Sequence, residues 1–245
     1  MNLHLMHADP SCTTCDLHTQ AKNVGIPSRH LEDSLPPDSD APLLYFLGRN
    51  PGYHEDLHGE CFVGKSGQIL LDGYIRPLSL EKHATIILGN ACRCYSTDDT
   101  PPNFPRQLRP CFESHTLTEL LWLSQTSRPL YIVCLGEQAT SALLRITLNR
   151  KASPQKDAFA LNGHTLTTPP LTLKTTKAHI PPITFTHIST YHPSAIYRAG
   201  MDQDGTSLSR YIFAVDSHMA LLHRLLTSGA RPISEPTRVP PFPPR

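Results

Sequence analysis

Four short runs of apolar and β-branched residues predict buried β-strands. The runs are Leu43–Leu47, Ala84–Leu88, Leu130–Leu135 and Thr184–Thr190. Each ends in turn residues, as strands of a parallel sheet covered on both faces do. Between the runs, apolar positions at helical spacing predict helices over residues 68–75, 112–123, 138–148 and 207–226. The last predicted helix carries an apolar face formed by Ile212, Val215, Met219, Leu222 and Leu226.

The alternation of strands and helices predicts a three-layer α/β/α sandwich around a short, mainly parallel, four-stranded central sheet. We expect a ligand to bind beyond the carboxyl ends of these strands. The 245 residues suffice for one such domain, which we place at residues 1–228. Residues 149–183 mix Thr, Pro and Lys and predict an insertion or lid, and residues 229–245 predict a flexible proline-rich tail.

Composition narrows the possible functions. Twenty-two Lys and Arg against 21 Asp and Glu leave a net charge of +1, so nucleic acid can bind only through a local basic face. No apolar run approaches the roughly 18 residues of a membrane-spanning helix, and the first residues do not form a secretory signal. Seven cysteines in such a chain favour a reducing cytoplasm, where clustered cysteines are metal ligands more often than disulfides.

Four of the cysteines have the spacing of a metal site. Cys12 and Cys15 form a C-x2-C pair, and Cys94 and Cys111 flank a proline-rich loop. Together they predict a four-thiolate site for zinc or an iron–sulfur cluster. A set of free, partly buried thiols is the alternative, and Cys92 is a competing ligand that spacing does not exclude.

The segment Gly59–Ser66 (GECFVGKS) matches the phosphate-loop pattern letter for letter. A phosphate loop must follow directly on a buried strand, however, and the residues before this one, YHEDLH, are polar. We therefore reject a nucleotide triphosphatase. The amides near Lys65 and Ser66 can instead hold a DNA phosphate at a helix N-terminus.

Two further turns follow predicted strands. Gly48-Arg49-Asn50-Pro51-Gly52 comes after the first strand, and Tyr191–Arg198, which contains His192-Pro193-Ser194, comes after the fourth. Taken singly, each has an ordinary explanation, since prolines and glycines impose turns and most histidines at strand ends have no chemical role.

In combination, these motifs resemble the uracil-DNA glycosylase superfamily, and most closely its iron–sulfur (family four) branch. That branch reads Gly-Glu-Ala-Pro-Gly, Gly-Glu-Pro-Phe-Val-Gly-Arg, an Asn four residues before a cluster Cys, and His-Pro-Ser. Here the same order is GRNPG from Gly48, GECFVGK from Gly59, NACRC from Asn90, and HPS from His192. The resemblance covers residues 12–200. It implies a structural [4Fe-4S] cluster on Cys12, Cys15, Cys94 and Cys111, favours Cys94 over Cys92, and makes zinc the less expected metal.

The resemblance also implies a role for each remaining motif residue in removing a flipped base. Phe62 stacks on the pyrimidine, Asn90 reads one base edge, His192 stabilises charge on the departing base, and Asn50 orients the attacking water. Further expected substrate contacts are Gly48, Arg49, Gly52, Tyr53, Asp56 and Ser194. Expected DNA contacts are Lys65, Ser66, Ile196, Tyr197 and Arg198.

The chain departs from the branch at Arg49-Asn50, which replaces Glu-Ala and resembles the mismatch-specific and single-strand-selective branches. Base choice therefore stays open among uracil, a thymine mismatch and a 5-modified pyrimidine such as the hypermodified cytosine of phage DNA. No motif places a lysine nucleophile, so we expect a monofunctional enzyme that leaves an abasic site. We also expect the protein to be a monomer. A catalytically silent nucleic-acid-binding module is the main alternative. A zinc-dependent hydrolase that uses some of the 14 histidines is the weakest reading.

Overall fold

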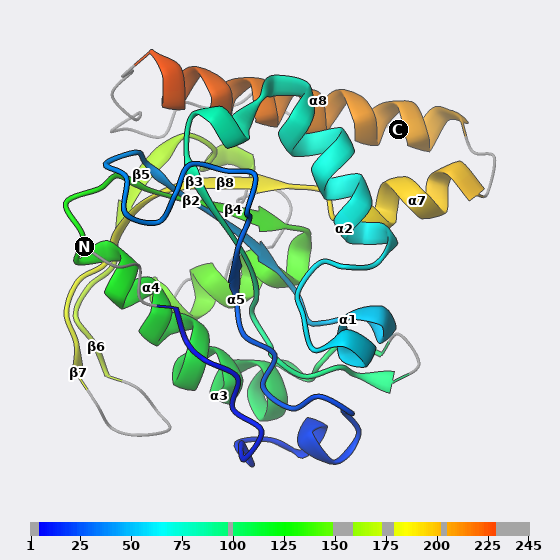
Figure 1. The fold of residues 1–245 in the computed structure, drawn as a ribbon, viewed down its shortest axis with the longest axis vertical. Coiled ribbons are helices and arrows are strands. Elements are labelled where there is room, and N and C mark those ends of the chain that lie inside the picture. Colours follow the sequence, from blue (N-terminus) through cyan, green and yellow to red (C-terminus); the bar gives the residue numbers. More distant parts are fainter. Residues whose placement is uncertain (1–4, 98–99, 149–158, 173–178, 202–204, 229–245) are drawn as a thin grey trace.

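The computed structural model describes residues 5–97, 100–148, 159–172, 179–201 and 205–228 (Figure 1). A six-stranded sheet in the order β1-β3-β2-β4-β8-β5 lies at its centre. The strands of this sheet are β1 (Arg29–His30), β2 (Leu43–Gly48), β3 (Thr85–Asn90), β4 (Leu130–Leu135), β5 (His164–Thr167) and β8 (Thr184–Thr190).

The four predicted strands are the four central, mutually parallel ones, β3, β2, β4 and β8. The prediction of four strands is wrong by two, because the sheet also has an antiparallel strand at each edge, β1 and β5. Their sequences, RH and HTLT, contain no apolar run, since an edge strand is not covered on both faces. A separate antiparallel pair joins β6 (Leu171–Thr172) and β7 (His179–Ile180).

Helices connect the strands and cover the sheet. They are α1 (Tyr53–His58), α2 (Lys65–Leu70), α3 (Arg109–Cys111), α4 (Leu117–Ser124), α5 (Glu137–Thr147), α7 (Pro193–Met201) and α8 (Gly205–Thr227). Short 3-10 or π-helical turns cover Asp16–Thr19, Leu71–Ile75, Arg76–Leu78, Leu80–Lys82, Phe104–Leu108 and Phe112–Thr116. Within the described ranges, no helix combines the length and apolar character that crossing a membrane requires.

The sheet carries helices on both faces, which confirms the three-layer sandwich. In β2, Leu44 and Phe46 pack in the core that α2 and α8 cover, whereas Leu43, Tyr45 and Leu47 pack in the core that α4 and α5 cover. Figure 1 shows these two helix groups on opposite sides of the sheet. The alternation follows from the period of two along a strand and explains why these strands read as continuous apolar runs.

The helix predictions need correction at three points. Helix α2 begins at Lys65 rather than residue 68, so Gly67 lies inside the helix, at a place where a Cβ would overlap the carbonyl of Phe62. Helices α1 and α7 were not predicted, since α1 is almost entirely polar and α7 begins at Pro193 within the His192-Pro193-Ser194 turn motif. In α8, Ile212 is 42% exposed, whereas Val215, Met219 and Leu222 are buried.

The segment 149–183 contains β5, β6 and β7, so part of it extends the central sheet. Its residues 149–158 and 173–178 lie outside the described residues, as does the predicted tail at residues 229–245. The division into a domain, a lid and a tail therefore stays a prediction.

Candidate active site and four-cysteine site

A cavity of about 640 Å³ opens at the carboxyl ends of the four parallel strands. Its wall includes residues 49–53 after β2, Asn90 at the end of β3, residues 135–138 after β4, and His192 after β8. This is the edge at which parallel sheets bind ligands. The fold therefore brings together three motifs that lie far apart in the sequence.

One wall of the cavity is built around Gly48, which pairs with Asn90 across β2 and β3. A Cβ at Gly48 would overlap Asn90 Oδ1 and lie 2.8 Å from the Phe62 ring. Phe62 adopts a positive φ of 57°, which is uncommon outside glycine, and its ring is buried. Gly48 is not among the residues that line the cavity; it leaves room for Asn90 and Phe62, which are. Its role as a substrate contact stays a prediction.

The Glu55 carboxylate ties the first two motifs together. It accepts the backbone N–H of Gly52 at 3.1 Å and that of Gly64 at 3.0 Å. A Cβ at Gly52 would stand 2.7 Å from Glu55 Oε2, so the missing side chain at Gly52 makes room for this bridge. Gly52, Tyr53 and Glu55 all line the cavity.

Asp56, which the sequence predicts as a substrate contact, is not among the residues that line the cavity. Its carboxylate oxygens accept the backbone N–H groups of Lys22 at 2.9 Å and Asn23 at 3.0 Å. These bonds hold the N-terminal segment against α1, so the contacts of Asp56 are structural.

His192 lines the cavity with a defined protonation state. Burial, with the nearby charges of Arg49 and Arg198, lowers the pKa of His192 to about 4, so the ring is neutral near pH 7. The backbone N–H of Ser194 donates to Nδ1 at 3.1 Å, and the Ser194 hydroxyl lies 2.8 Å from the same nitrogen. Because Nδ1 accepts, the single proton resides on Nε2.

Asn50 lines the cavity beside Arg49. Arg49 Nε donates to Asn50 Oδ1 at 2.5 Å, and Asn50 Nδ2 donates to the Pro51 carbonyl at 2.9 Å. Each polar atom of the Asn50 amide keeps one further hydrogen-bonding position. The two contacts fix the amide and leave it able to hold a water molecule.

The predicted DNA contacts divide into two groups. Ser66 and Arg198 line the cavity, whereas Lys65, Ile196 and Tyr197 do not. Lys65 Nζ donates to the Tyr197 hydroxyl at 2.9 Å and lies 4.9 Å from the centre of its ring. Ile196 is partly buried and packs against the core, and its insertion into a duplex stays a prediction.

The predicted metal ligands converge from three segments. Cys94 and Cys111 are buried, and the thiol of Cys94 interacts electrostatically with those of Cys111, Cys15 and Cys12. The backbone N–H of Gly25 points at Cys94 Sγ at 3.5 Å, and that of Arg93 at Cys111 Sγ at 3.2 Å. Thiols that meet in a buried site and accept N–H groups suit an iron–sulfur cluster.

Two features keep other ligand sets open. The Cys92 thiol is hydrogen bonded with those of Cys15 and Cys111, so it lies among the predicted ligands. The ligand atoms of Asp9, Cys12 and His115 lie within 4.8 Å of one another, and Cys12 Sγ is 3.4 Å from His115 Nε2. The choice of Cys94 over Cys92 therefore stays a prediction.

Comparison with known proteins identifies the family. Residues 36–212 match the model of the uracil DNA glycosylase superfamily. The chain belongs to this superfamily. Relatives named type-4 uracil-DNA glycosylase match it from Archaeoglobus fulgidus, Thermotoga maritima and Pyrobaculum aerophilum.

The three matches differ in extent. The Archaeoglobus protein is 28% identical over 138 residues, which cover 56% of this chain and 60% of the relative. The Thermotoga protein is 27% identical over 130 residues, covering 53% and 59%. The Pyrobaculum protein is 24% identical over 200 residues, covering 81% and 86%. The chain thus spans about three fifths of the first two relatives.

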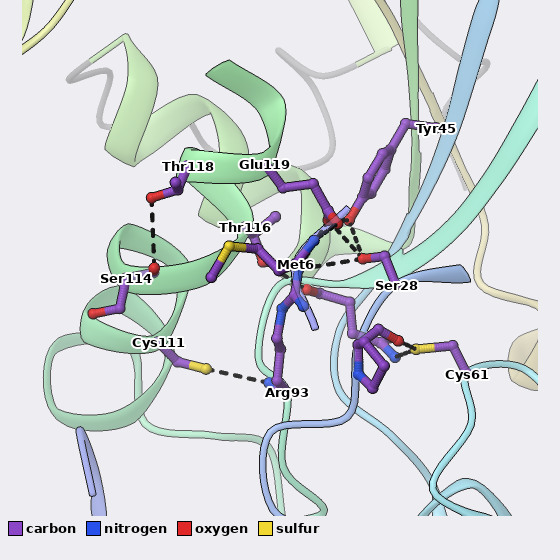
Figure 2. Close-up of polar contacts among 12 residues, drawn as sticks. Met6, Ser28, Tyr45, Cys61, Arg93, Cys111, Ser114, Thr116, Thr118 and Glu119 are labelled. Atoms are coloured by element: carbon purple, nitrogen blue, oxygen red, sulfur yellow. Dashed lines mark hydrogen bonds and ion pairs between the residues drawn. The ribbon is translucent and has the colours of Figure 1, made fainter. Parts of the chain in front are cut away.

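This superfamily member also contains a buried polar network that the sequence did not reveal. Glu119 is fully buried, and its Oε2 accepts hydrogen bonds at 2.7–2.8 Å from Ser28, Tyr45 and Arg93. Its Oε1 accepts the backbone N–H of Met6 at 3.0 Å. Figure 2 shows these groups converging on Glu119. Arg93 lies between Cys92 and Cys94, so the network connects the sheet to the cysteine loop.

Sequence reasoning also missed several residues of the cavity wall. Tyr95 lines it and lies edge-on to Tyr53, their ring centres 6.4 Å apart. Glu137 and Gln138 line it because they directly follow β4. Ligands bind beyond the carboxyl ends of parallel strands. This rule could have identified Glu137 and Gln138, because they closely follow the third predicted strand, Leu130–Leu135.

Proposed function

We propose that this protein is a monofunctional DNA glycosylase that removes uracil from DNA and leaves an abasic site. The observation that carries the proposal is that His192, Asn90 and Phe62 line the same cavity. The Ser194 N–H occupies His192 Nδ1, and burial lowers the pKa of the ring, so Nε2–H is available as a neutral donor. The three relatives named type-4 uracil-DNA glycosylase support uracil as the base. We retain the predictions that the protein acts as a monomer in the cytoplasm.

Each residue has a step that its chemistry suits. A flipped pyrimidine stacks on Phe62 while the Asn90 amide pairs with its edge. As the glycosidic bond stretches, negative charge develops on the departing base, and His192 Nε2–H donates to a base carbonyl. Asn50, held by Arg49, positions the water that attacks the sugar carbon. A neutral donor suits this role because it stabilises the charge without surrendering its proton.

The cavity lining supports base removal without cleavage of the DNA strand. In the described part of the chain, no lysine lines the cavity, and Lys65 directs its ammonium to Tyr197. An amine nucleophile would be needed to form a Schiff base with the sugar. We therefore propose base removal by water alone, without cleavage of the strand.

We propose that Cys12, Cys15, Cys94 and Cys111 hold a [4Fe-4S] cluster with a structural role. When bound, the cluster supplies four metal–sulfur bonds that join the N-terminal segment to the loop after β3 and to α3. The chain's own contribution is the pair of N–H groups of Gly25 and Arg93 that point at cysteine sulfurs.

An excision assay tests the activity. Single-stranded and duplex oligonucleotides with one uracil should yield abasic sites, and alkali should be needed to break the strand. Asn50→Ala should slow single-turnover excision while leaving the Kd for the oligonucleotide within about twofold, because its amide is assigned to the water. DNA binding without any excision would support the silent binding module instead.

A wider substrate range is a second candidate, favoured by the size of the cavity. At about 640 Å³ the cavity is larger than a pyrimidine base requires. We propose that 5-substituted pyrimidines are accepted, including hypermodified cytosines of phage DNA, which would assign the enzyme to antiviral defence. Oligonucleotides carrying uracil, a thymine mismatch, hydroxymethylcytosine and glucosylated hydroxymethylcytosine should be compared. Excision of uracil alone would restrict the enzyme to uracil repair.

A further inference from the structure

Cys61 lies directly behind Asn90, which is assigned above to read the base edge. Its side chain is buried, and Sγ contacts two polar groups: Asn90 Nδ2 at 3.4 Å and the Pro27 carbonyl at 3.1 Å. Figure 2 labels Cys61 and draws the contacts of its sulfur as dashed lines.

The directions of the two hydrogen bonds follow from the chemistry of the thiol. Burial raises the pKa of Cys61 to about 12, so the thiol keeps its single proton at physiological pH. The Pro27 carbonyl can only accept, and therefore the S–H donates to it. The sulfur is left as an acceptor, which requires the group of Asn90 that faces it to be the NH2.

We propose that Cys61 is a positioning residue that holds the Asn90 carboxamide in one orientation and thereby sets which base edge it can read. With Nδ2 on the side of Cys61, Oδ1 lies against Gly48, where a Cβ would overlap it. A rotation of the amide by 180° would face Oδ1 toward the sulfur and break the bond to Cys61. The backbone at Cys61 is itself held in place, because Arg29 Nε donates to the Cys61 carbonyl at 2.7 Å.

The orientation matters because uracil and cytosine present opposite orders of groups. Along the edge that an amide reads, uracil offers an acceptor and then a donor, whereas cytosine offers a donor and then an acceptor. A fixed amide matches one order, and an amide free to rotate matches both. Cys61 thus supplies discrimination between the two bases without touching either, an inference that rests on the proposed glycosylase function.

The test compares Cys61→Ala with Cys61→Ser, which retains a donor and an acceptor. Cys134→Ala is the matched control, because Cys134 is equally buried but lies in β4. The kcat/KM ratio of uracil over cytosine in single-stranded DNA should fall about tenfold in Cys61→Ala, the equivalent of one net hydrogen bond. The ratio should return in Cys61→Ser and stay unchanged in Cys134→Ala. An unchanged ratio in Cys61→Ala would overturn the inference.

A second measurement is independent of activity. Hydrogen exchange of the Asn90 side-chain NH2 can be followed by NMR after 15N-asparagine labelling, with the signals assigned by their loss in Asn90→Asp. Exchange should accelerate at least about tenfold in Cys61→Ala and remain near the wild-type rate in the other two variants. Equal rates in all variants would refute the positioning role. Normal protection of Asn90 in a protein that excises no base would refute the proposed function alone.

Discussion

The cavity and the four-cysteine site are held together in different ways. The cavity wall grows from the ends of β3, β2, β4 and β8, and the ladders between these strands fix the spacing of its residues. The cysteines come from the N-terminal segment, the loop after β3 and the α3 region. Among the described residues 5–28 of the N-terminal segment there is no β-strand. Thiol contacts, the N–H groups of Gly25 and Arg93, and Glu119 connect the three segments.

The difference teaches which changes should affect chemistry and which should affect stability. A side chain removed from the cavity leaves the strand ladders intact, so the fold should survive while the rate falls. A ligand removed from the four-cysteine site, or Glu119 removed beside it, releases segments that no ladder holds. Variants of the two regions should therefore separate into rate effects and stability effects.

The largest effect is expected at the cysteines. Cys94→Ser should lose iron, sulfide and the brown colour of the anaerobically purified protein, and should lower its melting temperature strongly, because metal binding and folding are coupled. Absorption spectra and iron analysis follow the cluster, and circular dichroism follows unfolding.

Cys92→Ser is the matched control for the ligand assignment. It should keep the iron, since Cys92 is the neighbour rather than the assigned ligand. If Cys92→Ser loses the iron and Cys94→Ser keeps it, the assignment of the two cysteines must be exchanged. If the purified protein is colourless and contains one zinc ion, the four-cysteine site binds zinc rather than an iron–sulfur cluster.

Next in size is Glu119→Ala. This change leaves Arg93 buried without its charge partner and breaks the contacts to Ser28, Tyr45 and Met6, so the free energy of unfolding should fall by about 3–5 kcal/mol. Denaturant unfolding measures the loss. Asp72→Ala, which breaks the exposed pair with Arg76, should cost at most about 0.5 kcal/mol. If the free energy of unfolding falls by a similar amount in Glu119→Ala and Asp72→Ala, the buried network does not hold these segments in place.

The sequence predicted the centre of the fold well because buried parallel strands have a strong local signal. All four apolar runs are β-strands in the structure. Residues that follow three of the runs, namely Asn50, Asn90 and His192, line the cavity. Local patterns failed where tertiary contacts decide. The edge strands β1 and β5 carry polar residues, and Ile212 lies at a helical position that the core does not reach.

The same distinction holds within the candidate site. Motif spacing pointed to Asp56, but adjacent residues on a helix face different directions, and Glu55 is the one that lines the cavity. Nothing local in the sequence signals that Glu119 meets Arg93 or that Cys61 meets Asn90. These contacts join segments 26 and 29 residues apart, and they exist only once the chain has folded.

His192→Ala should produce the largest rate effect. Removal of a donor to developing charge costs about 2.7–4 kcal/mol of transition-state stabilisation, or about 100- to 1,000-fold in single-turnover rate on uracil. The melting temperature and iron content should stay near wild type. His218→Ala is the matched control, because His218 also has a pKa lowered to about 4 by burial but bonds to Thr190 outside the cavity. Equal rates in the two variants would place the catalytic donor elsewhere.

The pH profile tests the neutral ring. Because the pKa of His192 is lowered to about 4, the rate should be level through pH 6.5, the ordinary value, and fall as pH drops through about 4. Protonation of Nδ1 would turn an acceptor into a donor facing the Ser194 N–H. Removing a positive charge by Arg198→Ala should raise the pKa and move the fall to higher pH. An inflection at pH 6.5 in the wild type would contradict the neutral tautomer near pH 7.

The smallest effect is expected at the rim, where Lys65 lies against Tyr197. Its ammonium keeps protons beyond the one shared with the Tyr197 hydroxyl, so it can also contact a DNA phosphate. Lys65→Ala should weaken binding about threefold at moderate salt for any sequence and reduce the slope of log K against log salt by about one. Tyr197→Phe keeps the charge and should keep the slope, and neither change should alter the rate at saturation. A slope unchanged in Lys65→Ala would mean that the ammonium serves only to position Tyr197, and the phosphate contact would then have to come from Arg198 or Ser66 on the cavity wall.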